Sequence, residues 1–107
     1  MALEIAIRRF GGPEVLEARD VPPEAPGRGQ IRIRHQAIGV NFTDVHGRRG
    51  DYAPLHALPM PLVLGLEAAG VVEAVGEGVE RFRAGDRVAY ASAPIGAYRE
   101  VRNFPAD

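Results

Sequence analysis

Glycine and proline divide this chain into short segments, and this constrains its fold more than any other feature. Thirteen glycines and nine prolines are spread over 107 residues, and the apolar residues fall between them in brief runs. Short apolar runs bounded by turn residues are typical of strands joined by tight turns. The pattern therefore predicts a mainly β domain with one or two short helices.

Seven segments have the apolar content expected of strands. They are residues 3–7, 15–21, 30–40, 62–64, 68–75, 87–91 and 97–101. After the third segment, Asn41 or Thr43 is placed to cap a short helix that runs to about residue 48 and ends at Gly47 or Gly50.

The segment 30–40 alternates most strictly. One face carries Ile31, Ile33, His35 and Ala37, and the other carries Gln30, Arg32, Arg34 and Gln36. We expect the first face to be buried and the second to be solvated. On this reading His35 is a histidine satisfied by core or edge contacts and not a metal ligand.

Two glycines lie inside or between strand-like segments in the second half of the chain. Gly65 follows the segment 62–64, and Gly70 interrupts the segment 68–75. A glycine within a strand indicates a bulge or the close approach of another backbone. We expect one of these two features at each glycine.

The composition excludes several classes of protein. The chain has no cysteine, which excludes disulfides and thiolate metal sites within it. Its formal net charge of −1 gives no overall field that would attract nucleic acid or a membrane surface. It has no apolar run long enough for a membrane span and no signal-peptide pattern at its start. These features fit a single cytoplasmic domain.

A glycine-rich stretch supplies the most specific motif. Gly65-Leu66-Glu67-Ala68-Ala69-Gly70 is followed by Gly76 and Val79. This pattern resembles the signature Gly-His-Glu-x-x-Gly-x5-Gly-x-x-Val of the medium-chain dehydrogenase/reductase superfamily. Residues 37–44, 76–88 and 96–98 are similar to the same superfamily, and the first and last of these blocks look like bacterial NADPH:quinone oxidoreductases.

Two positions depart from the metal-binding members of that superfamily. Leu66 stands where the signature has a histidine that binds catalytic zinc in alcohol dehydrogenases, and Asn41 stands where those enzymes have a ligand cysteine. Leucine cannot coordinate a metal, and an amide oxygen is a poor substitute for a thiolate at a zinc site. The three histidines, separated by 11 and 10 residues, match no local zinc spacing either. The resemblance thus implies the zinc-independent branch, with NADPH as cofactor and no metal.

The resemblance also implies a domain organisation. Residues 1–107 would form the N-terminal part of a GroES-like catalytic domain, which is a partly open β-barrel. A full-length member of this family adds an α/β Rossmann domain after this segment and is expected to be a homodimer. The Rossmann domain would hold most of the NADPH, so the 107-residue chain alone is expected to be inactive.

The implied site lies around the predicted short helix. By resemblance, Asn41 touches the cofactor near the nicotinamide and Phe42 lines its ribose side. Thr43, His46 and Tyr52 would donate hydrogen bonds toward the oxyanion that develops on the substrate. Thr43 and His46 occupy the places of the hydroxyl and the histidine of the proton relay in zinc alcohol dehydrogenases, although quinone reductases often have tyrosine at the second place. A structural alternative stays open for three of them: Asn41 as a helix cap, His46 as a surface histidine and Tyr52 as a packing residue.

Asp44 and Glu67 occupy the inner carboxylate positions of the superfamily. Without a metal, the simplest role for both is structural, in a buried ion pair with an arginine or in a cluster of backbone amides. General acid–base catalysis is the alternative. It requires that the carboxylate lie within hydrogen-bond distance of the proton that it transfers.

The implied function is transfer of a hydride or of electrons from NADPH to a quinone or another activated enone. A 2-enoyl thioester reductase of the same superfamily is the alternative among enzymes. A non-catalytic structural or RNA-binding role, as in the crystallin-like relatives, is the alternative outside them. The sequence does not favour RNA binding, because it has neither a positive net charge nor a basic stripe with aromatic residues.

Overall fold

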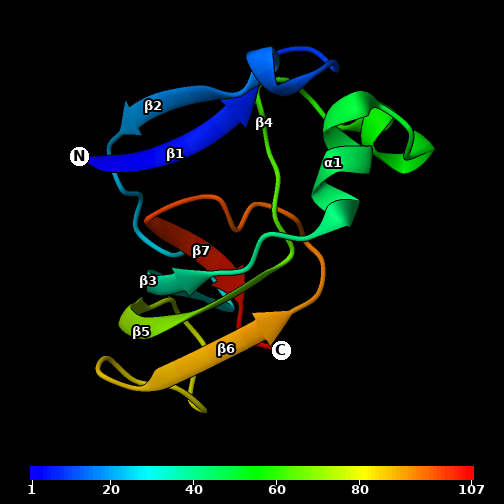
Figure 1. Cartoon of the computed structure of the whole chain (residues 1–107). Coiled ribbons are helices and arrows are strands. Elements are labelled where there is room, and N and C mark those ends of the chain that lie inside the picture. The colour runs from blue at the N-terminus through cyan, green and yellow to red at the C-terminus, as the bar shows by residue number, and fades with distance from the viewer.

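The computed structural model describes all residues from 1 to 107, and its fold is mainly β with one α-helix, as expected (Figure 1). In chain order, the elements are β1 (Ala2–Ile7), a 3₁₀ turn (Pro13–Val15), β2 (Glu17–Val21), β3 (Gln30–Ile38), α1 (Phe42–Arg49), a second 3₁₀ turn (Ala53–Ala57), β4 (Leu62–Val63), β5 (Glu67–Val75), β6 (Arg87–Ala91) and β7 (Val101–Pro105).

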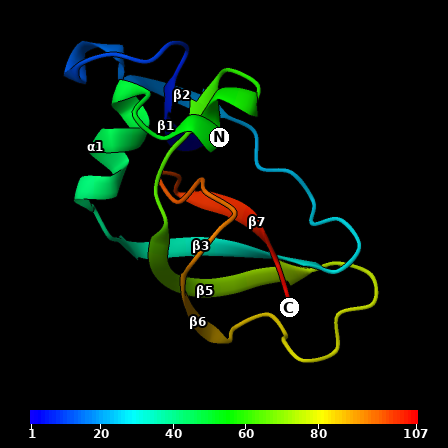
Figure 2. The same cartoon turned by 90° about the vertical axis from the view of Figure 1, so that its right-hand side faces the viewer.

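The strands form two antiparallel sheets. One has the order β2-β1-β4, and the other has the order β6-β5-β3-β7. In Figure 1 the three-stranded sheet lies above the four-stranded sheet, and α1 lies to one side of the upper sheet. Figure 2 shows that the chain passes between the two levels through the long linker after β2 and again between β4 and β5.

Each sheet has its own small core. Ile7, Val15, Leu55, Leu62 and Leu64 pack together around the three-stranded sheet, and Ile31, Ile33 and Val72 pack together in the four-stranded sheet. The division into two clusters follows the topology, because no strand belongs to both sheets.

Close backbone contact explains the glycine inside β5. A Cβ atom at Gly70 would lie 2.1 Å from the carbonyl oxygen of Arg34 on the neighbouring strand β3. Gly65, between β4 and β5, has a φ of +103°, which L side chains rarely adopt. Both glycines therefore match the expectation of a bulge or a close approach.

The short helix begins and ends where the sequence predicts. Asn41 occupies the N-cap position in an extended conformation, and Gly50 ends the helix in the left-handed region with a φ of 86°. His46, Arg48 and Arg49 lie in the last turn, where positive charge interacts favourably with the helix dipole.

The predicted last strand, 97–101, is wrong, because β7 spans Val101–Pro105 and pairs with the first half of β3. The backbone N–H groups of Gly96 and Ala97 both donate to the carbonyl of Gly65, and that of Tyr98 donates to Leu64. These bonds hold residues 96–98 as a loop against the β4–β5 connection. The predicted second strand was also too long, since Pro13–Val15 is a 3₁₀ turn that buries Val15.

One face of β3 also differs from the alternating pattern. Ile31 and Ile33 are buried as expected, but Ala37 is exposed. The pairing of β3 with β5 shifts register between His35 and Ala37, which turns the end of the strand away from the core. On the other face Arg32 is half-buried, because its guanidinium donates to the carboxylate of Glu73 at 3.0 Å.

Candidate functional site

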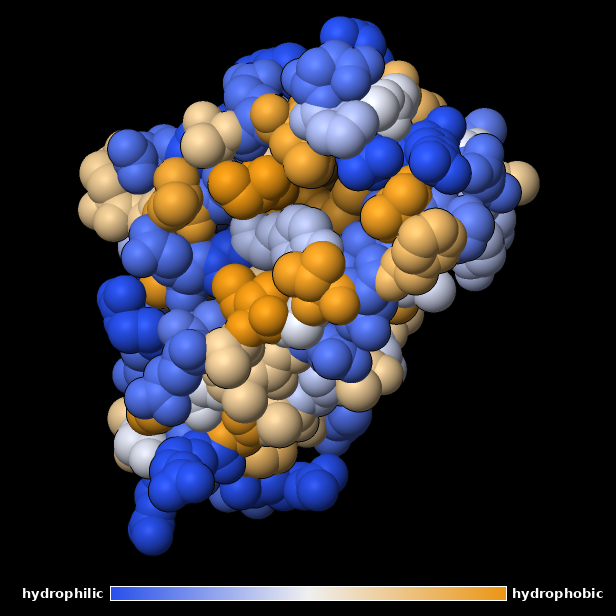
Figure 3. Space-filling view, in the orientation of Figure 1, coloured by the Kyte–Doolittle hydropathy of each residue, from blue (hydrophilic) through white to orange (hydrophobic).

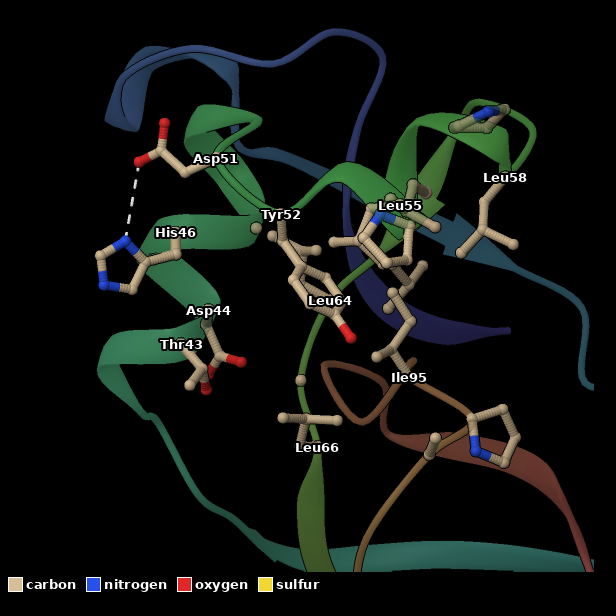
Figure 4. Close-up of a pocket in the computed structure, with 18 of the residues that line it drawn as sticks. Thr43, Asp44, His46, Asp51, Tyr52, Leu55, Leu58, Leu64, Leu66 and Ile95 are labelled. Atoms are coloured by element: carbon tan, nitrogen blue, oxygen red, sulfur yellow. Dashed lines mark ion pairs between the residues drawn. The ribbon is translucent and has the colours of Figure 1, made fainter.

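A cavity of about 960 Å³ opens between α1 and the loop before β7. Its lining residues come from α1, the segment that follows it, the β4–β5 connection and the loop 93–95. They include Thr43, Asp44, His46, Tyr52, Leu55, Leu62, Leu64, Leu66 and Ile95. Figure 4 shows α1 on one side, the loop with Ile95 on the other, and the β4–β5 connection between them. Apolar walls with a few polar groups are typical of a site for a small organic molecule.

The β4–β5 connection fixes the floor of the cavity. A Cβ atom at Gly65 would lie 2.7 Å from the Tyr98 ring and 2.9 Å from the Ala97 side chain, so only glycine fits there. The next residue, Leu66, lines the cavity. The structure thus places an apolar side chain in the cavity at the position where the signature has histidine.

The three expected hydrogen-bond donors all line this cavity. Thr43 and His46 lie on α1, and Tyr52 lies just after the helix with its ring in the middle of the view in Figure 4. The Nδ1 atom of His46 is 3.6 Å from the carboxylate of Asp51, a contact that leaves Nε2 available. The structure thus brings these three residues together in one cavity, and their roles stay predictions.

The two residues expected to contact a cofactor lie at the rim and are not among the lining residues. Asn41 donates its backbone N–H to the Asp44 carboxylate at 3.0 Å. Phe42 is 68% exposed, and its ring contacts the edge of the His46 ring at a centroid distance of 5.0 Å.

Exposed apolar residues continue from this rim onto the neighbouring surface. Ile38, Val40 and Phe42 are all exposed where β3 ends and α1 begins. Figure 3 shows apolar surface gathered in the middle of one face, with hydrophilic residues toward both ends.

Asp44 is buried and joins α1 to the floor of the cavity. Its carboxylate accepts the N–H of Asn41 and the hydroxyl of Tyr98, which is 2.5 Å away. Burial raises the pKa of Tyr98 above its ordinary value of 10, and the hydrogen bond to the Asp44 carboxylate raises it further. Tyr98 therefore stays protonated and donates. Its partnership with Asp44 could not be read from the sequence, because 54 residues separate the two.

Glu67 is half-buried at the first position of β5. Its backbone carbonyl accepts the N–H of Gly39 at 3.0 Å, and a side chain at position 39 would overlap its carboxylate. Neither Glu67 nor Asp44 lies within 4.0 Å of an arginine nitrogen. Of the two structural arrangements expected for Asp44, the structure has the bond to a backbone amide.

A buried arginine that the sequence reasoning missed holds the loop wall of the cavity. Arg102, on β7, is only 5% exposed, and its guanidinium donates to the carbonyls of Pro94 and Ile95 at 3.3 and 3.1 Å. It also donates to the Tyr90 hydroxyl at 3.2 Å and lies over the Tyr90 and Phe104 rings. Because Arg102 holds the carbonyl of Ile95, the position of the Ile95 side chain in the cavity depends on this arginine.

The same network continues to His35. The Tyr90 hydroxyl is 2.9 Å from His35 Nε2, and His35 Nδ1 is 2.7 Å from the carbonyl of Arg99. Arg102 donates to Tyr90, Tyr90 can then donate to Nε2, and Nδ1–H donates to the carbonyl, which satisfies the Tyr90 hydroxyl and both ring nitrogens when His35 is neutral. Burial lowers the pKa of His35 below its ordinary value of 6.5, and the nearby charges of Arg102 and Arg99 also lower it.

This network predicts loss of stability in mild acid. Because the folded-state pKa of His35 lies below 6.5, the unfolded chain binds more protons as pH falls through 6.5, and stability falls until the folded-state pKa is passed. His35→Gln should flatten this part of the profile, measured by urea unfolding at about pH 5 and about pH 8. His56→Gln, at an exposed histidine that contacts the Gly50 carbonyl, is the control. Identical slopes in the His35 variant and the parent chain would contradict the role of this network.

No group of three or more histidine, cysteine, aspartate or glutamate side chains is placed to hold a metal ion, and Leu66 lines the cavity.

The chain also has no helix with the length and hydropathy of a membrane span.

The two-sheet β fold with one short helix and a cavity at its side defines a GroES-like domain. The profile of the family described as Alcohol dehydrogenase GroES-like domain matches residues 27–106, and the chain belongs to this family. Several of the relatives that it matches are quinone oxidoreductases. The one from Pseudomonas aeruginosa is 52% identical over 101 residues, which are 94% of this chain and 30% of that protein.

Solved structures give the same result. Quinone oxidoreductase from Pseudomonas syringae pv. Tomato DC3000 superposes with a TM-score of 0.90 at 52% identity, covering 98% of this chain and 31% of that one. Quinone oxidoreductase from Escherichia coli, complexed with NADPH, superposes with a TM-score of 0.90 at 44% identity, covering 97% of this chain and 31% of that one. The chain thus spans about a third of the length of the relatives it matches, and the mainly β, GroES-like fold is confirmed.

Proposed function

We propose that this domain forms the substrate side of an oxidoreductase that transfers a hydride or electrons from NADPH to a quinone, without zinc. The observation that carries the proposal is the cavity itself, in which Leu66 lies at the metal-ligand position and Thr43, His46 and Tyr52 line the same space. A quinone is a flat apolar ring with carbonyl oxygens, and such a cavity offers apolar walls with a few donors.

The donors would take over the part that a Lewis acid plays in metal-dependent relatives. When a carbonyl is reduced, negative charge develops on its oxygen, and a placed hydrogen-bond donor stabilises that charge. NADPH, when bound, supplies the hydride. The exposed Phe42 ring at the rim and the neighbouring Asn41 would contact it, in keeping with the E. coli relative, whose structure is a complex with NADPH.

The proposal extends to the setting in which the domain works. We infer a cytoplasmic enzyme, a homodimer when complete, that binds neither nucleic acid nor membrane, in line with a net charge of −1. A Rossmann domain would make most of the contacts that bind NADPH. A 2-enoyl thioester is the alternative acceptor, and side-by-side kinetics on the two acceptors separates them.

The test is a chimera in which these 107 residues replace the matching segment of the E. coli quinone oxidoreductase. We expect it to oxidise NADPH with 1,4-benzoquinone, whereas the 107-residue chain alone should not. Removing the donor that serves the oxyanion should lower kcat by about 100-fold, measured separately for Thr43→Val, His46→Gln and Tyr52→Phe.

His56→Gln serves as the matched control in the same chimera, because His56 does not line the cavity. If all three donor variants keep kcat within about threefold of the parent chimera, the donors do not act on the oxyanion.

A further inference from the structure

One side of the cavity carries polar residues, and the other side carries apolar ones. Thr43 and His46 line it from α1, and Ile95 lines it from the loop 93–95. In Figure 4 Ile95 lies across the cavity from these two residues, with Leu66 between the two sides. A quinone held by one of its oxygens at α1 therefore extends across the cavity toward Ile95.

The cavity is larger than a quinone with a single ring needs. Its volume of about 960 Å³ lies near the upper end of the range, about 300–1,000 Å³, that sites for small molecules usually have. Most of the lining residues outside α1 are apolar, among them Leu58, Leu64, Leu66 and Ile95. The space beyond a first ring thus suits further carbon atoms and offers few partners for polar groups.

The main chain around Ile95 is fixed on both sides. The carbonyl of Ile95 accepts a hydrogen bond at 3.1 Å from Arg102, which is buried. The N–H groups of Gly96 and Ala97 both donate to the carbonyl of Gly65, at 3.0 and 3.2 Å. A wall that is already in place costs little to order when a ligand binds.

The Ile95 side chain is half-buried. It packs against the core cluster around the three-stranded sheet, and it also lines the cavity. The apolar surface that it leaves open in the cavity can contact a ligand, and this contact would remove apolar surface from water on both partners.

We propose that Ile95 determines specificity by contacting the part of the acceptor that lies away from α1. It favours quinones with a second, apolar ring over quinones with a single ring. This inference rests on the proposed function, because the quinone oxygen held at α1 is what directs the rest of the acceptor toward Ile95.

The first arm of the experiment measures binding without turnover. The 107-residue chain, labelled with ¹³C in its isoleucine methyl groups, is titrated with 2-acetylnaphthalene in the absence of NADPH and followed by NMR. We expect a saturable shift of the Ile95 methyl signal and none at Ile38, which is 38% exposed and does not line the cavity. The inference is overturned if the Ile95 signal does not shift, or if the Ile38 signal shifts in parallel. This arm uses the parent chain, so it decides the matter even if a variant at Ile95 does not fold.

The second arm measures specificity in the chimera. Ile95→Ala should lower kcat/KM for 1,4-naphthoquinone by about tenfold and keep kcat/KM for 1,4-benzoquinone within about threefold of the parent chimera. Leu16→Ala is the matched control and should change neither value, because Leu16 is exposed and lies outside the cavity.

The inference and the proposed function fail in different ways. Equal losses of kcat/KM with the two quinones would overturn the role of Ile95 and leave the quinone function standing. A folded chimera that reduces neither quinone would refute the proposed function itself, and the role of Ile95 in specificity would fall with it.

Discussion

A Gly70→Ala substitution should lower the free energy of unfolding by about 3 kcal/mol or more. The added Cβ would lie 2.1 Å from the carbonyl oxygen of Arg34, so the central strands β3 and β5 must separate to admit it. The clash is with backbone, which cannot rotate away as a side chain can. Urea unfolding followed by far-ultraviolet circular dichroism measures the loss.

Gly27→Ala is the matched control. A Cβ at that position would meet only the flexible end of the Gln30 side chain, at 3.2 Å, and Gly27 does not have a positive φ. We expect a change within about 0.5 kcal/mol. If the two alanine variants unfold at the same urea concentration, then the close approach of β3 to Gly70 is not as described.

Asp44→Ala should destabilise the chain by about 2–4 kcal/mol, because it leaves two donors without an acceptor in the interior. These donors are the Asn41 N–H at the start of α1 and the Tyr98 hydroxyl in the loop 96–98. Without the Asp44 carboxylate, no hydrogen bond from this position links α1 to the loop 96–98, so the cavity should widen. The same urea unfolding experiment measures the effect.

Asp51→Ala is the control, since Asp51 is exposed and contacts only His46 at 3.6 Å. A double-mutant cycle with Tyr98→Phe isolates the bond between Asp44 and Tyr98. We expect the two substitutions to be strongly non-additive. Additive losses would show that the carboxylate stabilises the fold by other means.

Local patterns predicted most of the fold. Glycines and prolines marked the turns, alternation found β1 and β3, and Asn41 and Gly50 marked the ends of α1. The last strand failed for a reason that no local pattern contains. Residues 97–101 have the apolar content expected of a strand, but the N–H groups of Ala97 and Tyr98 are taken by Gly65 and Leu64, more than 30 residues earlier.

The candidate site, like the fold, could be predicted only in part from local sequence patterns. Thr43, His46 and Tyr52 lie within ten residues of one another, and a helix followed by a short connection brings them to one cavity. Tyr98 and Arg102 come from the other end of the chain and bind residues that line the cavity, Asp44 and Ile95. Their partners are fixed by the packing of the two sheets, which no local spacing reveals.

The central claim is that side-chain donors replace a metal in this cavity. The most direct test measures NADPH oxidation with 1,4-benzoquinone by the chimera after treatment with a chelator, together with its zinc content. The account predicts full activity with less than about 0.1 zinc per chain, since no set of ligands is present to retain the ion. Activity that disappears with the chelator and returns with added zinc would contradict it.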